Sequence, residues 1–423
     1  MKIKKALSVI IAAAMATSCL GFAACTPRDE VLKIYNWGDY INEDLIGVFE
    51  DWYKTETGKN ITVQYDTFDT NETMLMRIET QKADYDLVCP SEYVAERMIN
   101  SKLAKKLNKD IFDIDMDTAF YEGLADTIKP FDAHNEYFVP YEWGTFGIMY
   151  DTDHITPGSD ECKSWSALWS RDWEKNTGKR RVLMKDSVRD AYSVALLYQN
   201  RDALYAASEG FTNYHTEEYQ SLLTSFYSNV TAKSIEAAQK TLVAQKPAVY
   251  KYEVDNGKED MLAGTTDAWL AFLWSCDVLL VMIDGGGDHF YYEVPEEGSN
   301  VWLDGWIIPK YAKNEKAANY FLKFINTHEY AKKNFEYLGA TLPLRSVMDE
   351  VREEIEAETT TGETDWKEFF DSFDPDYRNE FKAMLIDTLF PPAEVLARCG
   401  VMRDCGLKKS VDLASMWIDV KTY

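Results

Sequence analysis

The sequence has none of the common catalytic motifs. It contains no GxSxG nucleophile motif, no Walker phosphate-binding loop and no GxGxxG dinucleotide-binding loop. Its five histidines are scattered, without the HExxH spacing of zinc hydrolases. The carboxylates of Asp113, Asp115 and Asp117 resemble the start of a calcium loop, but its glycine and glutamate positions hold Thr118 and Leu124. We therefore expect no catalytic site, no metal and no cofactor.

Cysteine is scarce as well. After Cys25 the cysteines are an odd set without close metal-ligand pairs: Cys89, Cys162, Cys276, Cys399 and Cys405. An odd number excludes a complete disulfide framework. Cys399 and Cys405 are close enough in sequence to bridge, but we expect free buried thiols.

Positive charge is in short supply. The 45 lysines and arginines face 71 acids, which gives a formal charge of −26. Loss of residues 1–24 would remove three lysines and no acids, and would take the charge to −29. Because nucleic acids and anionic membrane surfaces repel such a chain, neither is an expected partner. A cationic ligand is compatible with it.

The N-terminus is typical of an exported lipoprotein. Three lysines within the first five residues precede an apolar stretch that is too short to span a membrane, so we interpret residues 1–24 as a signal peptide. It ends in Phe22-Ala23-Ala24-Cys25, which resembles a bacterial lipobox; Cys19 is the weaker candidate. Acylated Cys25 would then begin a short linker, residues 25–30, and would be the protein's only membrane attachment.

The remaining chain predicts two α/β lobes. Roughly 400 residues exceed what one hydrophobic core usually holds. Strand-like and helical patterns alternate along the chain, as in layered α/β folds. We expect strands at 32–37, 61–65, 85–89, 181–184 and 268–274. We expect helices around 45–53, after a cap at Asn71, and at 190–198, 315–325 and 330–338, the last closed by Gly339, and a loop at 359–363.

Aromatic residues recur beside acids or hydroxyls at predicted strand ends. The instances are Trp37-Gly38-Asp39-Tyr40, Ser91-Glu92-Tyr93, Trp274 and Trp302-Leu303-Asp304. Ligands of open α/β sheets bind at such ends. Aromatic faces attract cations by roughly 0.5 to 2 kcal/mol, and carboxylates hydrogen-bond them, so the pattern fits ammonium groups linked by methylenes. Taken singly, each aromatic residue is more often explained by packing. Asp39 or Ser91 alone is also explained as the start of a helix, and Asp304 alone as part of a turn.

Together these segments resemble the spermidine/putrescine-binding proteins of polyamine ABC transporters. The matching stretches also include Thr70-Asn71-Glu72-Thr73-Met74, Tyr85 to Tyr93, Val139-Pro140-Tyr141-Glu142-Trp143-Gly144 and Ser164 to Trp169. The resemblance implies a two-lobed type II periplasmic-binding-protein fold, each lobe a mostly parallel sheet flanked by helices and joined by a hinge. It places lobe 1 at 31–143 plus about 300–345, and lobe 2 at 144–299 plus about 346–423.

The resemblance also implies roles for individual residues. Trp37, Tyr40 and Tyr93 would sandwich a methylene chain, and Asp39 and Ser91 would hold one amine. Trp302 and Asp304 would contact the chain and the other amine near the hinge. From lobe 2, Ser187 and Asp190 fall at two ligand-binding acid positions, and Trp274 matches a tryptophan that faces the ligand.

This sequence departs from the family pattern at two of these places. Ser187 replaces an acid, and Ala340 stands where the family has a ring. Loss of a carboxylate favours a ligand with two nitrogens over one with three, because a third ammonium would be poorly paired. Nearby Asp186 or Glu142 is available to compensate. The choice between putrescine and spermidine stays open.

We therefore expect a monomeric, non-enzymatic binding lipoprotein on the outer face of the cytoplasmic membrane of a Gram-positive type of cell. It would capture a polyamine by hinge closure and deliver it to ABC permease subunits. Two alternatives remain: a binding protein for another small ligand, such as a cationic amino acid, a sugar or a metal, and a surface adhesin or enzyme that only shares the fold.

Overall fold

The computed structural model describes residues 27–174, 178–254, 256–283, 289–361 and 364–422. The predicted signal peptide and Cys25 lie outside these residues. Export and lipidation therefore stay predictions. Within the described part, no helix is long and apolar enough to cross a membrane.

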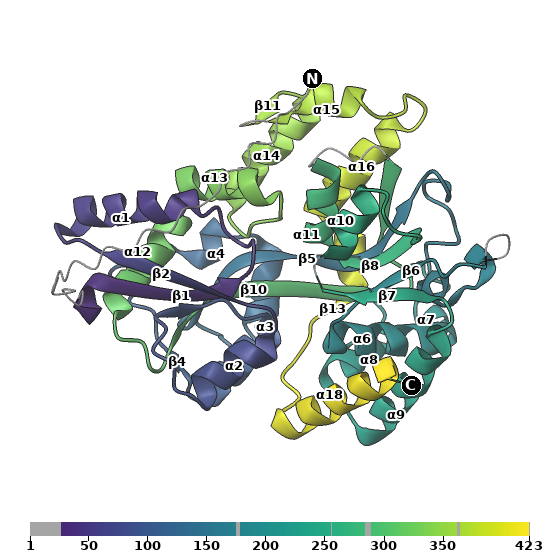
Figure 1. The fold of residues 1–423 in the computed structure, drawn as a ribbon, viewed down its shortest axis with the longest axis horizontal. Helices are drawn as coiled ribbons and strands as arrows, with labels where there is room; N and C mark the ends of the chain where they lie inside the picture. The colour runs from purple at the N-terminus through teal and green to yellow at the C-terminus, as the bar shows by residue number, and fades with distance from the viewer. Residues whose placement is uncertain (1–26, 175–177, 255, 284–288, 362–363, 423) are drawn as a thin grey trace, which may run out of the picture.

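The chain forms an α/β fold in which helices cover a large curled sheet (Figure 1). The strands are β1 Val31–Trp37, β2 Thr62–Phe68, β3 Leu87–Val88, β4 Ala104–Lys105, β5 Phe138–Asp151, β6 Val182–Lys185, β7 Val249–Glu253, β8 Leu270–Trp274, β9 Phe290–Glu293, β10 Ser299–Pro309, β11 Thr360–Thr361, β12 Thr364–Asp365 and β13 Cys399–Gly400. The α-helices are α1 Asp44–Thr57, α2 Asn71–Glu79, α3 Glu92–Asn100, α4 Met116–Ala119, α5 Glu122–Ile128, α6 Val188–Gln199, α7 Arg201–Ala207, α8 Glu217–Ser228, α9 Ala232–Gln245, α10 Asn256–Leu262, α11 Ser275–Val281, α12 Glu315–Ile325, α13 His328–Leu338, α14 Arg345–Ala357, α15 Trp366–Asp371, α16 Arg378–Leu389, α17 Ala393–Ala397 and α18 Leu407–Thr422.

Two long strands connect the halves of the sheet. The order is β2-β1-β3-β10-β5-β8-β6-β7, with parallel pairs at both ends and antiparallel pairs around β5 and β10. Both β5 and β10 are buried along nearly their whole length. Figure 1 shows β10 running from the half that holds β1 and β2 into the half that holds β6 and β7. These two strands form the hinge between the lobes.

Most of the predicted elements are present, with two local corrections. Gly339 closes α13 in the left-handed conformation, with φ of 64°, as its position predicts. Asn71 does not cap α2: Thr70 is the N-cap and accepts from the Thr73 amide, while Asn71 is the first helical residue. The predicted loop at 359–363 contains β11, which pairs antiparallel with β12, so its described residues 360–361 are a strand.

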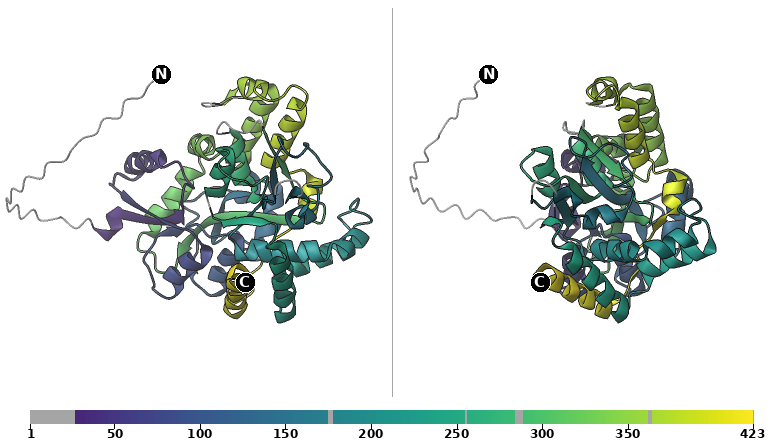
Figure 2. Two further views of the ribbon diagram at one scale, coloured as in Figure 1. Left: turned by 45° about the vertical axis from the view of Figure 1, so that its right-hand side comes forward. Right: turned by 90° about the vertical axis from the view of Figure 1, so that its right-hand side faces the viewer.

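The C-terminal segment packs against both halves of the molecule. After α13, α14 packs on α13, whereas α16 packs on α11 and β9, and α18 packs on α6 and α9. The chain therefore ends beside α9 (Figures 1 and 2). The residue boundaries of the two lobes given above stay a prediction.

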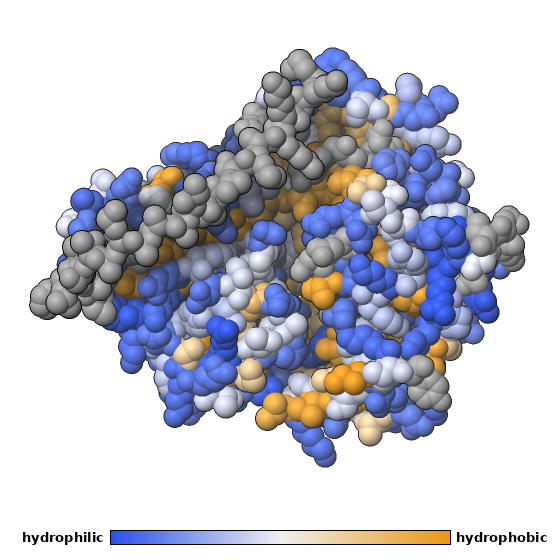
Figure 3. Space-filling view, viewed as in Figure 1, coloured by the Kyte–Doolittle hydropathy of each residue, from blue (hydrophilic) through white to orange (hydrophobic). Residues whose placement is uncertain are grey.

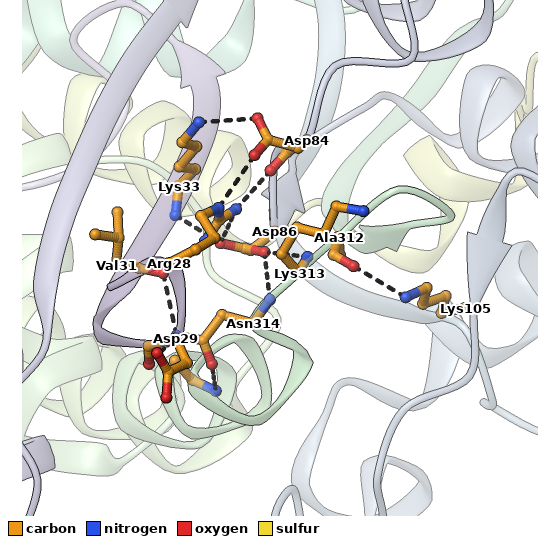
Figure 4. Close-up of polar contacts among 11 residues, drawn as sticks. Arg28, Asp29, Val31, Lys33, Asp84, Asp86, Lys105, Ala312, Lys313 and Asn314 are labelled. Atoms are coloured by element: carbon orange, nitrogen blue, oxygen red, sulfur yellow. Dashed lines mark hydrogen bonds and ion pairs between the residues drawn. The ribbon is translucent and has the colours of Figure 1, made fainter. Parts of the chain in front are cut away.

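A buried aspartate ties the start of the folded chain to lobe 1. Asp86 is fully buried and accepts backbone hydrogen bonds from Lys33 at 2.9 Å and from Lys313 and Asn314 at 2.8 Å each (Figure 4). Arg28 pairs with the same carboxylate at 2.8 Å. This network joins the start of β1 to the start of α12, at the end of β1 opposite Trp37.

The face drawn in Figure 3 is mainly hydrophilic, with several hydrophobic patches. All five cysteines of the described part are free thiols, as expected, although only Cys89 and Cys162 are fully buried.

Candidate ligand-binding site

The predicted site residues gather around two aspartates, one on the hinge strand β10 and one on α6 of lobe 2. Asp304 is 8% exposed and Asp190 is 7% exposed. The charge of Asp190 raises the pKa of Asp304, so the two carboxylates act on each other across the lobes. We call these two aspartates, with the side chains that contact them, the hinge group.

Asp304 is held by residues that follow β1 and β3. The Tyr40 hydroxyl donates to Oδ2 of Asp304 at 2.9 Å. Ser91, directly after the Pro90 that stops β3, pairs with Asp304 in an isolated antiparallel bridge, and the Gly305 amide donates to the Pro90 carbonyl at 3.1 Å. The family resemblance placed Ser91 and Asp304 at different amines, whereas the structure pairs them at one place.

Asn71 organises two other predicted residues. Its amide nitrogen donates to the Ser91 hydroxyl at 2.9 Å and to the Tyr93 hydroxyl at 3.1 Å, and its Oδ1 accepts from the Ser91 amide at 3.2 Å. The sequence placed Asn71 in a matching motif but assigned it only to a helix cap. The structure shows that it positions Ser91 and Tyr93 instead.

Lobe 2 contributes a second acid–aromatic pair. The Trp274 indole, at the end of β8, donates to Oδ2 of Asp190 at 3.0 Å. Ser187 is the N-cap of α6 without a side-chain cap bond, and its hydroxyl lowers the pKa of Asp190. Ser187 and Trp274 thus adjoin Asp190, and the ligand-binding roles predicted for the three residues stay predictions.

Two internal cations adjoin this lobe-2 end. The Lys185 ammonium lies 4.6 Å from the Trp274 ring centroid, and the Arg189 guanidinium lies 4.8 Å from that of Tyr93. Lys185 is paired with Asp277 at 2.8 Å and with Glu253 at 3.2 Å. These contacts occupy aromatic faces that the sequence had assigned to the ligand, and no sequence motif identified them.

The two remaining tryptophans make their hydrogen-bond and ring contacts with residues other than the two aspartates. Trp302 lies two residues before Asp304 on β10, so both face the same side of the strand, and its indole donates to the Thr145 carbonyl at 3.0 Å. Trp37 packs on Phe68 at 4.5 Å between ring centroids. Its buried indole nitrogen has no partner among the described residues.

Asp39 is a predicted site residue that makes no hydrogen bond to the described residues of the hinge group. Its side chain is exposed in the turn after β1, and its φ of 50° lies in the left-handed region, which aspartate tolerates better than most residues. Its role at one amine stays a prediction.

Two buried glutamates were not assigned from the sequence. Glu92 accepts from the Leu303 amide at 3.0 Å. Glu142 lies directly across from Asp304 in the β5–β10 pair and is fully buried. The sequence named Glu142 only as a replacement for the acid that is missing at Ser187.

Burial dominates the electrostatics of this group. It is the main reason that the pKa of Asp304 rises to about 6, which the Ser91 and Tyr40 hydroxyls moderate. Burial likewise raises the pKa of Asp190 to about 6, against the effects of Ser187, Trp274 and Arg189. It raises the pKa of Glu92 to about 8 and that of Glu142 well above its usual range. Buried acids with raised pKa values bind a cation readily, because the cation replaces the proton.

Comparison with known proteins identifies the family of the chain. Residues 51–362 match the model of the bacterial extracellular solute-binding protein family. The chain belongs to this family. It is 28% identical over 327 residues to the spermidine/putrescine-binding periplasmic protein of Escherichia coli K12, covering 77% of this chain and 81% of the relative. It is 25% identical over 333 residues to the putrescine-binding periplasmic protein of the same organism, covering 76% and 80%.

Solved structures of similar solute-binding proteins show the same fold. The spermidine/putrescine ABC transporter substrate-binding protein of Streptococcus pneumoniae has a TM-score of 0.63 at 24% identity, covering 93% of this chain and 99% of that one. A lipoprotein of Treponema pallidum has a TM-score of 0.64 at 20% identity, covering 93% and 100%. The predicted family resemblance and the two-lobed α/β fold are confirmed.

Proposed function

We propose that this solute-binding protein captures a polyamine between its lobes. The observation that carries the proposal is the pair Asp304 and Asp190, two buried carboxylates from different lobes, each hydrogen-bonded to an aromatic side chain. An alkyl diamine is a dication at pH 7, since the reference pKa of such an amine is about 10.4. One ammonium would meet each carboxylate, and the methylenes would lie among the aromatic residues.

This placement of the two ammonium groups gives each residue of the site a proposed role. Asp304, with Tyr40 and Ser91, would hold one ammonium, and Asp190, with Ser187 and Trp274, the other. Trp37, Tyr93 and Trp302 would contact the methylene chain. Because Ser187 is neutral, a ligand with two nitrogens would be better paired than one with three. Putrescine is therefore our first candidate.

Ligand entry requires the lobes to separate. Asp304 and Asp190 are almost fully buried, so a ligand cannot reach them without motion at β5 and β10. We propose that closure around the ligand creates the form that ABC permease subunits recognise. Binding and release of an unchanged solute need no catalytic residue.

The family and the N-terminal sequence both support a location outside the cytoplasm. Extracytoplasmic binding fits a bacterial extracellular solute-binding protein. We propose that acylated Cys25 tethers a monomer to the outer face of the cytoplasmic membrane, beside its permease. Radiolabelled palmitate incorporation into wild-type protein, and its loss in Cys25→Ser, would test the tether.

The alternative ligands fit the site less well. A cationic amino acid needs a cation for its α-carboxylate, but Arg189 donates to the Arg403 carbonyl at 3.0 Å and Arg345 donates to the Phe120 carbonyl at 3.3 Å. A sugar gives no reason for opposed buried acids. An adhesin would expose its aromatic residues, whereas the aromatic residues of this site are buried or half-buried.

Isothermal titration of the purified protein with putrescine, cadaverine, spermidine, spermine, lysine and glucose tests the proposal. We expect saturable binding of at least one polyamine and tighter binding of diamines than of lysine or glucose. No heat with any polyamine would refute the assignment.

A further inference from the structure

Glu142 is a buried carboxylate without a partner. It has no exposed surface, and neither of its oxygens accepts a hydrogen bond from any described residue. Buried carboxylates in folded proteins are normally paired or hydrogen-bonded, because an isolated buried charge is very costly. A carboxylate retained in this setting needs another reason to be there.

Local strand geometry directs Glu142 toward Asp304. In the β5–β10 ladder Asp304 pairs with Glu142, but Gly305 pairs with Pro140, so Tyr141 is an extra residue on β5. Such a bulge bends a strand and re-aims its side chains, often beside a functional site. Residues directly opposite on antiparallel strands lie on the same face of the sheet. The side chains of Glu142 and Asp304 are therefore neighbours on one face.

The neighbours of Glu142 do not satisfy it. Tyr40 has a single hydroxyl hydrogen, which it donates to Asp304 at 2.9 Å. The Tyr141 hydroxyl donates to the Tyr40 carbonyl at 2.8 Å. Burial raises the pKa of Glu142 most and the charge of Asp304 raises it further, whereas the nearby Tyr40 hydroxyl lowers it. Because that hydroxyl gives its one hydrogen to Asp304, it leaves both oxygens of Glu142 without a hydrogen bond in the described part of the chain.

We propose that Glu142 and Asp304 bind the same ammonium group of the ligand. This inference rests on the proposed function. A primary ammonium has three N–H donors and no acceptor, and two facing carboxylates offer it more acceptors and more charge than one. The two ends of the site then differ: two acids meet one ammonium at the hinge, whereas Asp190 meets the other beside Arg189.

Glu142 also compensates for the carboxylate that is missing at Ser187. A site that loses a carboxylate from lobe 2 regains one at the hinge, so its acid count is restored while its position changes. Glu142 is thereby a specificity-determining residue: it favours a ligand with a terminal primary ammonium at the hinge end, where substitution of the nitrogen would remove a donor.

The test is titration of wild-type protein, Glu142→Gln, Glu142→Asp and the control Glu293→Gln with putrescine. Glu293 is a matched control, because burial raises its pKa to about 7 and it lies on β9, opposite Ile148 of the same long strand β5. We expect Glu142→Gln to bind about 10- to 100-fold more weakly, the loss of one charged hydrogen-bond partner, with Glu142→Asp in between. Glu293→Gln should bind within about twofold of wild type.

Two further readouts separate a shared ammonium from a structural role. The double variant Glu142→Gln with Asp304→Asn should lose less affinity than the two single losses combined, because both acids act on one group. Proton release on binding, from titrations in buffers of different ionisation enthalpy, should fall in Glu142→Gln. If the wild-type protein binds putrescine and Glu142→Gln binds it with the same affinity, the shared subsite is wrong but the polyamine function stands. Additive losses in the double variant would have the same meaning. If the wild-type protein binds no polyamine, the polyamine function is wrong as well.

Discussion

Replacing Asp304 with asparagine should stabilise the ligand-free protein and weaken ligand binding at the same time. Burial raises the pKa of this carboxyl from 3.8 to about 6. A rise of that size means that ionised Asp304 destabilises the folded protein by up to about 3 kcal/mol at pH 7. Asparagine keeps the shape and accepts from Tyr40, but cannot ionise.

The sign of the effect gives a pH signature. Because the folded pKa is raised, the destabilisation is fully present above about pH 6. It decreases as the pH falls through 6 and vanishes below about 4, where Asp304 is protonated in both states. We therefore expect Asp304→Asn to raise the melting temperature by about 3 °C at pH 7, and by much less at pH 4.5.

Binding should change in the opposite direction. A hydrogen bond to a charged group contributes about 1.5 to 3 kcal/mol, so loss of the charge at Asp304 should weaken putrescine binding by about 10- to 150-fold. Differential scanning calorimetry and isothermal titration measure the two effects. Asp387→Asn, on the exposed side of α16, is the control and should leave affinity unchanged. A lower melting temperature at pH 7 together with wild-type affinity would refute the reasoning.

Three other predictions follow from the same contacts. Putrescine affinity should fall by about tenfold for each of Asp190 and Asp304 between pH 7 and pH 5, since both have a pKa of about 6 and must ionise to bind a cation; an affinity that is constant over this range by titration calorimetry would contradict this. Asn71→Ala should weaken binding by about 5- to 30-fold, because Ser91 and Tyr93 lose the side chain that orients them; equal affinity would show that they are held by other contacts. Asp86→Ala should lower the free energy of unfolding by about 3 to 5 kcal/mol, because it leaves Arg28 and three backbone amides without this buried acceptor. It should leave the putrescine affinity of the folded protein unchanged. Denaturant unfolding and titration calorimetry measure the two quantities, and wild-type stability would show that the network is not stabilising.

The fold was largely predictable because its signals are local. The apolar spacing of 315–325 matches α12 residue for residue, and Gly339 ends α13 where expected. Strand 85–89 is shorter than predicted, with only Leu87–Val88 in the ladder, because strand length depends on partners that lie far away in sequence. The pairing of β5 with β10 likewise joins segments about 160 residues apart, which periodicity along the chain does not reveal.

The site was predictable in part for a related reason. Tyr40, Ser91, Asp190, Trp274 and Asp304 lie in recognisable motifs, and the structure brings them together. Glu142 owes its direction to a bulge, and Asn71 owes its role to two side chains about 20 residues away. Asp39 shows the converse: a motif position alone does not fix the direction of a side chain in a turn.

The central claim is that two opposed carboxylates recognise two ammonium groups, and titration of wild-type protein with putrescine beside n-butylamine tests it most directly. Both ligands share a four-carbon chain, but butylamine leaves either Asp190 or the Asp304 end unpaired. We predict that putrescine binds at least about 100-fold more tightly, since an unpaired buried charge costs several kcal/mol. Equal affinities, or no binding of putrescine or any other polyamine, would contradict the account.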